Sequence, residues 1–265
     1  MIKQKNKEVV KIKIDQQKCD GCLKCIPYCP VQAIKRKAKK IWIELDLCLE
    51  CGACLRAEVC ATQALYLQEM HWPRTIRAAF SGTNYLGYAQ VLDKKSTPRR
   101  EFEIAKHWGG GRGTSEMKTN DVMESFKPGE VGIGCELGRP GVSFYFRDLE
   151  KVTVKLVENG VQLLPINPVT QLLNPKTGKI RDEYSDIKNE RALSAIVEFK
   201  LEMEKAIDIL RVLQAVSKEI ETVFSVNIIN RCENGTIPFK SMLDKAGIAV
   251  AINGKTCIGL GRIPA

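Results

Sequence analysis

The sequence predicts an α+β protein with two parts: a small, cysteine-rich domain over residues 1–70 and a larger domain over residues 71–265. Three observations lead to this prediction. Eight of the eleven cysteines lie between residues 19 and 60, eleven of the twenty glycines lie between residues 82 and 141, and residues 151–265 alternate between strand-like and helix-like stretches. A chain of 265 residues also exceeds the usual size of one domain.

The N-terminal domain contains an internal repeat. Its first copy holds Cys19, Cys22, Cys25 and Cys29, and its second copy holds Cys48, Cys51, Cys54 and Cys60. The flanks recur as well, since CPVQAI follows the first triple and CATQAL follows the second. Strand-like segments precede both copies, VVKIKI at 9–14 and IWIEL at 41–45. We therefore predict two copies of a strand, a cysteine loop, a fourth cysteine and a short helix.

The spacing of the cysteines indicates iron–sulfur chemistry. Three thiols separated by two residues each let one tight loop bind three irons of a cubane [4Fe–4S] cluster, with Gly21 and Gly52 allowing the turns. Zinc sites use CxxC pairs rather than CxxCxxC triples, and disulfide frameworks belong to short secreted chains. The fourth ligand of each cluster must come from elsewhere in the chain.

Residues 9–68 resemble a bacterial-type dicluster ferredoxin. In that pattern, the fourth cysteine of each run binds the cluster of the other run. The resemblance implies one cluster on Cys19, Cys22, Cys25 and Cys60, and a second cluster on Cys48, Cys51, Cys54 and Cys29. Two extra residues precede Cys60, and Ala61 stands where the family has proline. The insertion predicts a bulged loop and clusters that differ in solvent exposure and potential.

Charge is distributed unevenly along the chain. Its net charge is +10, and residues 1–40 hold twelve Lys or Arg against three Asp or Glu. The segment KRKAKK (35–40) is either a solvated connector or a docking surface for an acidic redox partner. Nucleic-acid binding is disfavoured because aromatic residues are not interleaved with the basic ones. The charged start and the lack of an eighteen-residue apolar stretch predict a cytoplasmic protein without a membrane span.

Residues 71–150 are glycine-rich, and we predict that loops dominate them. Within HWGGGRGTSEMKTND (107–121), a ligand or cofactor loop is predicted at Gly109, Gly110, Gly111, Arg112 and Gly113. Its rival is an exposed loop tip. Backbone amides and Arg112 suit a carboxylate or a phosphate, with Lys118 and Arg139 as further cations. GEVGIGCELGRPG (129–141) is also interpreted as turns, because it matches neither a P-loop nor the dinucleotide-binding fingerprint.

The region 151–265 predicts a compact sheet under helices. Expected strands are KVTVKLV (151–157), TVFSVNII (222–229), IAVAI (248–252) and TCIGLGRI (256–263). Residues 187–220 predict one long helical segment, interrupted near Phe199, and PFKSMLDKAG (238–247) predicts a short helix. Cys135, Cys232 and Cys257 are expected to be buried apolar residues, and His71 and His107 to be packed rather than proton donors.

A second resemblance concerns the region from GGGRGTSEM (109–117) to VTVKL (152–156), with NPVTQLL (167–173) and ALSAIVEFK (192–200). It is similar to the region after the ferredoxin segment in proteins like 6-hydroxynicotinate reductase. The resemblance implies reduction of a pyridine ring carboxylate by low-potential electrons, with any flavin or substrate site supplied by another subunit. It identifies no catalytic residue.

Three functions follow from the sequence, and the third is a binding module that clusters stabilise without redox turnover, a role for which one cluster would suffice. The first is low-potential electron transfer through two [4Fe–4S] clusters, as a ferredoxin-like subunit or domain of a reductase complex. Such a chain would serve a redox partner or catalytic subunit within a homo- or hetero-oligomer. The second is an iron–sulfur reductase that itself binds and reduces a small carboxylated substrate.

Overall fold

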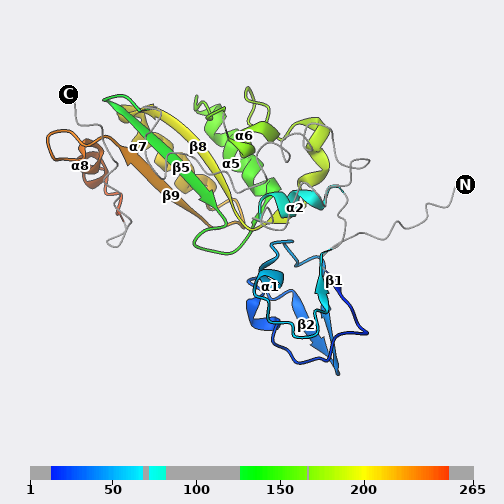
Figure 1. The fold of residues 1–265 in the computed structure, drawn as a ribbon. Coiled ribbons are helices and arrows are strands. Elements are labelled where there is room, and N and C mark those ends of the chain that lie inside the picture. Colours follow the sequence, from blue (N-terminus) through cyan, green and yellow to red (C-terminus); the bar gives the residue numbers. More distant parts are fainter. Residues whose placement is uncertain (1–12, 68–71, 82–125, 166, 251–265) are drawn as a thin grey trace, which may run out of the picture. The chain divides into compact units, whose positions relative to one another are not determined.

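The computed structural model describes residues 13–67, 72–81, 126–165 and 167–250 (Figure 1). The chain divides into two compact units. Unit 1 comprises Met1–Arg112 and Asn189–Leu193, and unit 2 comprises Gly113–Lys188 and Ser194–Ala265. Unit 1 thus adds a later segment of the chain to the predicted cysteine-rich domain. The predicted boundary at residue 70 stays a prediction.

Two small antiparallel sheets form the cysteine-rich part of unit 1. Strand β1 (Lys13–Ile14) pairs with β4 (Leu65–Tyr66), and β2 (Ile34–Lys37) pairs with β3 (Lys40–Ile43). The first pairing joins the strand before the first cysteine run to the strand after the second run. Both ends of the repeat therefore lie together.

Strands β2 and β3 form a hairpin with an apolar and a basic side. Paired residues of an antiparallel ladder share a face, so Ile34 and Ile41 lie on one face, and both are buried. Lys35 pairs with Trp42 on the opposite face, which also carries Lys37 and Lys40. The KRKAKK segment is therefore a β-hairpin, and its outward face places a partly exposed tryptophan among lysines.

The short helices of the repeat differ in position from the prediction. The 3-10 helix η1 (Ile26–Tyr28) lies between Cys25 and Cys29, and helix α1 (Ala53–Arg56) contains Cys54, so both end before the fourth cysteine of their run. Each fourth cysteine is instead followed by a turn and then by β2 or β4. The helix expected after it was wrong, because the following apolar residues pair as strands.

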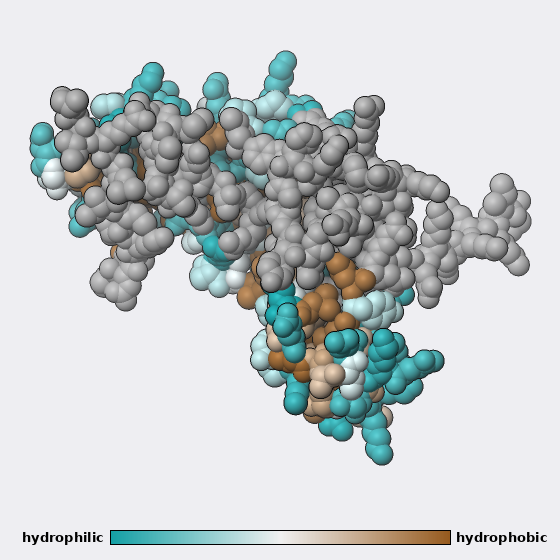
Figure 2. Space-filling model, viewed as in Figure 1, coloured by the Kyte–Doolittle hydropathy of each residue, from teal (hydrophilic) through white to brown (hydrophobic). Residues whose placement is uncertain are grey.

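Unit 1 also contains helix α2 (Thr75–Ala79) and strand β7 (Arg191–Ala192). All five residues of α2 are buried, and the helix contacts β7. Apolar residues reach the surface of the cysteine-rich part of this unit among hydrophilic ones (Figure 2).

Unit 2 is built on a three-stranded antiparallel sheet of order β8-β5-β9. Its strands are β5 (Glu130–Leu137), β8 (Ala195–Glu202) and β9 (Phe224–Asn230). Every second residue of the central strand faces one side, where Val131, Ile133 and Cys135 are fully buried. That face is the core of the unit.

Helices cover this sheet. Helix α7 (Met203–Val216) packs against β5 and β8, and α5 (Phe146–Glu158) packs against α7 (Figure 1). The shorter elements are β6 (Phe144–Tyr145), α6 (Pro168–Leu172), the 3-10 helix η4 (Asp182–Ile187) and α8 (Pro238–Lys245). The predicted α+β class therefore holds for the described residues.

Three predictions in this region were wrong. Residues 151–157 belong to α5, because Leu149, Val152 and Leu156 form a buried helical stripe that a seven-residue window misses. The first half of the predicted long helix is β8, whose residues pair along the whole of β5. The predicted turns of 129–141 contain β5 itself, the central strand.

Other predictions for this region are confirmed, and some fall on residues outside the described part. β9 and α8 confirm the predicted strand over 222–229 and the predicted helix over 238–247. The described residues 248–250 form no strand, and residues 251–265 lie outside the described part. Among the described residues, no helix has both the length and the apolar character needed to cross a membrane.

Candidate metal sites

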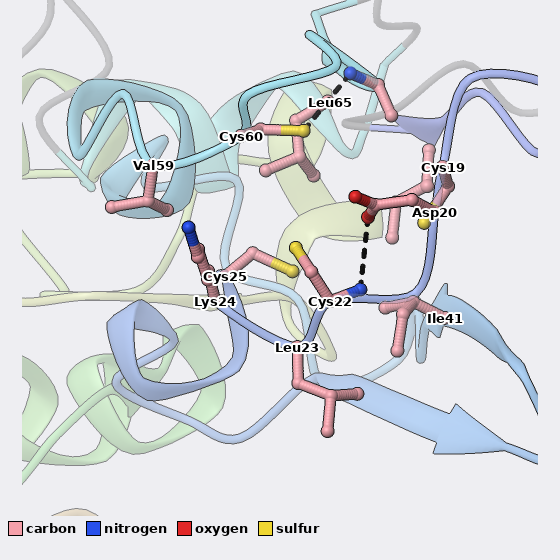
Figure 3. Close-up of a pocket in the computed structure, with 12 residues that line it drawn as sticks. Cys19, Asp20, Cys22, Leu23, Lys24, Cys25, Ile41, Val59, Cys60 and Leu65 are labelled. Carbon is pink, nitrogen blue, oxygen red and sulfur yellow. Dashed lines mark hydrogen bonds between the residues drawn. The ribbon is translucent and has the colours of Figure 1, made fainter.

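Four cysteines line one hollow in unit 1. They are Cys19, Cys22, Cys25 and Cys60, and their sulfur atoms lie around a shared space (Figure 3). Ile14, Ile41 and Leu65 complete the walls with apolar side chains. Cys60 reaches this hollow because β4, which follows it, pairs with β1, which precedes Cys19. The pairing thus explains how a cysteine of the second run meets the triple of the first.

Backbone geometry shapes the loop of this hollow. The amide of Cys22 donates to Oδ1 of Asp20 at 3.1 Å, and the amide of Cys19 donates to the carbonyl of Asp15 at 2.9 Å. Gly21 has φ +74°, and a Cβ built on it would lie 2.7 Å from the carbonyl oxygen of Lys39. Only glycine fits there without a shift of the β2–β3 turn.

The remaining four cysteines of the repeat line a second hollow. They are Cys29, Cys48, Cys51 and Cys54, with walls that include Ile34, Ile43 and Leu49. Cys48 and Cys54 are buried, whereas Cys22 of the first hollow is exposed. The two hollows therefore differ in their access to solvent.

The fourth cysteine of each run has the same hydrogen bond. The amide of Ala33 donates to Sγ of Cys29 at 3.0 Å, and the amide of Ala64 donates to Sγ of Cys60 at 3.2 Å. The sequence repeat is thus also a structural repeat. Burial opposes ionisation of Cys60, but hydrogen bonds from Thr62 and the Ala64 amide outweigh it, so that the Cys60 pKa is lowered.

Burial raises the pKa of three thiols at the second hollow, those of Cys48, Cys51 and Cys54. It raises the pKa of Cys54 to about 12, and it raises the pKa of Cys51 above its ordinary value. The pKa of Cys48 is raised by burial first and by the Glu50 carboxylate second. Because thiolates are the ligands of iron, binding at this hollow must expel protons that burial retains.

The donor set fits a [4Fe–4S] cluster at each hollow, with four sulfurs and mostly apolar walls. Within the described ranges, no three His, Cys, Asp or Glu side chains converge closely enough to hold a single metal ion. A cubane does not require such convergence, because each of its four irons takes one cysteine.

Comparisons with known proteins identify this part of the chain. Residues 11–34 match the family described as "4Fe-4S binding domain". The N-terminal segment is a ferredoxin-type 4Fe–4S domain. Two curated relatives, ferredoxins of Mycolicibacterium smegmatis and of Alicyclobacillus acidocaldarius subsp. acidocaldarius, are each 40% identical to this chain over 45 residues.

These matches cover a limited part of each protein. They span 17% of this chain, 41% of the first ferredoxin and 55% of the second, so this chain spans about half the length of the curated relatives that it matches. No solved structure matches the chain. The resemblance of later residues to 6-hydroxynicotinate reductase has no support in these comparisons.

Two buried arginines hold the second cysteine loop of the ferredoxin-type domain. Arg74 immediately precedes α2, and Arg77 lies within it. Arg74 binds the fully buried Glu50 carboxylate at 2.6 Å and the Leu45 carbonyl at 2.7 Å. Arg77 donates to the carbonyl of Cys48 at 2.8 Å. The sequence interpretation missed both residues. Two arginines three residues apart in the apolar stretch after residue 71 were the available signal.

The structure does not describe most of the other predicted site residues. Residues 109–113, Lys118 and both histidines lie outside the described part. Arg139 pairs with Glu136 at 3.4 Å on unit 2. Cys135 is fully buried as expected, but Cys232 is exposed, and Cys257 lies outside the described part.

Proposed function

We propose that this chain transfers single low-potential electrons through two [4Fe–4S] clusters, as a ferredoxin-like subunit or domain of a reductase complex. The observation that carries the proposal is the second hollow. Its four cysteines include Cys29 from the first run, as the first hollow includes Cys60 from the second. A single-cluster domain would not need this reciprocal exchange.

Each residue set has a defined role in this function. When bound, each cluster supplies a one-electron couple. The thiolates hold the irons, and the apolar wall residues limit contact with water, more so at the second hollow, which favours a low potential. The amides of Ala33 and Ala64 stabilise the negative charge on the fourth sulfur of each set.

The second element of the proposal is an acidic redox partner that docks on the β2–β3 hairpin. The outward face of the hairpin carries Lys35, Lys37 and Lys40 around Trp42, which is 37% exposed. Positive charge steers an acidic protein toward this face, and an exposed aromatic ring is a common anchor of interfaces. A hydrated connector would not need a large apolar side chain at the centre of its basic face.

Reduction of a carboxylated substrate by this chain itself stays an alternative without an observation in its favour. It depends on residues 109–113, which lie outside the described part. A flavin on a partner subunit also stays a prediction.

Quantification of iron, sulfide and electrons tests the proposed function. Anaerobically purified protein should contain about eight iron and eight sulfide per chain and take up about two electrons from dithionite. Four iron per chain and uptake of one electron would indicate that the chain binds a single cluster. Zinc in place of iron would end the proposal.

A further inference from the structure

Arg77 contacts the second cysteine loop at several points. Its Nη1 donates to the carbonyl oxygens of Leu45 at 3.1 Å, Asp46 at 3.3 Å and Cys48 at 2.8 Å. Its Nε forms an ion pair with Glu190. One guanidinium therefore fixes the backbone immediately before and at the first cysteine of the second run.

The ion pair is nearly removed from water. The side chain of Arg77 is 8% exposed and that of Glu190 is 16% exposed. Charges in such surroundings interact more strongly than charges at the surface, because little water screens them. Glu190 comes from a segment 113 residues further along the chain, which belongs to unit 1 although the residues before and after it in the sequence belong to unit 2.

Beside the first cysteine loop, the ion pair among the described residues is that of Lys18 with Asp15 at 3.9 Å, whose side chains are 61% and 32% exposed. The charged residues that line the first hollow, Asp20 and Lys24, are both exposed.

At the second loop, an exposed cation also occurs: Arg56 donates to the carbonyl of Cys51 at 2.6 Å. The buried pair of Arg74 and Glu50 also lies at the second loop, with side chains that are 9% and 0% exposed. The two loops therefore differ in buried charge, and Arg56 offers an exposed comparison for Arg77.

Reduction of a cluster adds one negative charge to it. A buried positive charge nearby stabilises the reduced form and raises the potential, whereas a buried negative charge lowers it. Arg77 and Glu190 oppose each other in this respect. Removing either one leaves the charge of the other uncompensated beside the loop of Cys48.

We propose that Arg77 and Glu190 are positioning residues that hold the second cysteine loop and, by opposing charges, tune the reduction potential of the second cluster. The inference rests on the proposed function, because it requires a cluster on Cys29, Cys48, Cys51 and Cys54. It makes the potential of that cluster depend on Glu190, a residue far from the cysteine repeat in sequence.

The test is a potentiometric titration of the full-length holoprotein, monitored by EPR, with three charge variants. Arg77→Met should shift the second cluster toward the oxidised form by about tenfold, a lowering of ~59 mV for one electron. Glu190→Gln should shift the same cluster in the opposite direction by a similar factor. The double variant Arg77→Met/Glu190→Gln should lie between the two.

Three controls separate charge from loosened structure. The first cluster is an internal control, and its reduction potential should not change. Arg77→Lys keeps the charge and should stay near the wild-type potential, and Arg56→Met removes an exposed cation and should have a smaller effect than Arg77→Met. If Arg77→Met fails to bind the second cluster, the loop-holding role is supported. The potential of the second cluster in Glu190→Gln then tests the electrostatic role of the pair.

Some outcomes would overturn the inference. Shifts of the same sign in Arg77→Met and Glu190→Gln would indicate general loosening of the loop, as would equal shifts of both clusters. Unchanged potentials in both variants would show that the pair has no electrostatic role. A wild-type protein with only four iron would instead defeat the proposed function, so the two failures are distinguishable.

Discussion

Ile14 pairs with Leu65 across the β1–β4 ladder, which joins the two ends of the cysteine repeat. Cys19 follows the first strand by a few residues, and Cys60 precedes the second strand by a few residues. A pairing of only two residues on each strand therefore brings ligands from both runs to one hollow. This pairing supports the proposed exchange of fourth ligands between the runs.

Gly21→Ala should disturb the first hollow. Its positive φ and the 2.7 Å approach of the added Cβ to the Lys39 carbonyl would cost about 1–3 kcal/mol in the free energy of unfolding. Thermal unfolding of the holoprotein and iron content measure the effect. Gly235→Ala is the matched control, because its φ is +76° and nothing lies within 4 Å of the added Cβ. Equal losses in both variants would contradict the role of the close approach.

Neutralising the basic hairpin should slow association with an acidic acceptor. Lys35, Arg36, Lys37, Lys39 and Lys40 would be replaced by glutamine, and electron transfer to a strongly acidic flavodoxin would be followed by stopped flow. The rate should fall at low salt and converge with wild type at high salt, where charges are screened. Lys176→Gln/Lys179→Gln removes exposed lysines of unit 2 as a control. Equal rates at every ionic strength would leave the hairpin a hydrated connector.

Asp148→Asn should destabilise unit 2. The buried Asp148 carboxylate accepts hydrogen bonds from the amide of Thr222 at 3.0 Å and from its hydroxyl at 2.7 Å. Loss of the charged acceptor should reduce the free energy of unfolding by about 1–3 kcal/mol in chemical denaturation. Glu204→Gln, in the first turn of α7 and exposed, is expected to change stability by less than ~0.5 kcal/mol. An unchanged free energy of unfolding in Asp148→Asn would show that this contact contributes little to stability.

Arg112→Ala tests the predicted ligand loop. If residues 109–113 bind an anion, the variant should lose affinity for 6-hydroxynicotinate, used here as the probe in calorimetry. Its iron content and dithionite reduction should stay unchanged, because the cysteines are untouched. Absence of binding by the wild-type protein, or equal binding by both, would remove the loop from the list of sites.

The cysteine repeat allowed much of unit 1 to be predicted. Cluster chemistry requires thiols at fixed spacing, so the spacing identified the two cysteine triples, and the resemblance to dicluster ferredoxins assigned Cys60 to the first triple and Cys29 to the second, as the structure groups them at the two hollows. The arginine contacts could not be predicted in this way. Arg77 and Glu190 are far apart in sequence, and no local pattern indicates that their side chains meet.

Unit 2 was harder to predict because pairing overrode local pattern. β5 contains Gly132 and Gly134, which favoured turns, yet the strand is held by neighbours on both sides. Strand β8 continues directly into α7 at Met203, so the apolar residues of both elements merged into one helical pattern. Only the partner strands distinguish the two halves.

The central claim is that two clusters share their cysteines crosswise, and the most direct test is EPR of reduced cysteine variants. The spectrum of Cys60→Ala should match that of Cys22→Ala, with the first cluster altered and the second intact. The spectrum of Cys29→Ala should match that of Cys51→Ala instead. If Cys60→Ala reproduced the spectrum of Cys51→Ala, each run would keep its own fourth ligand, and the crosswise arrangement would be contradicted.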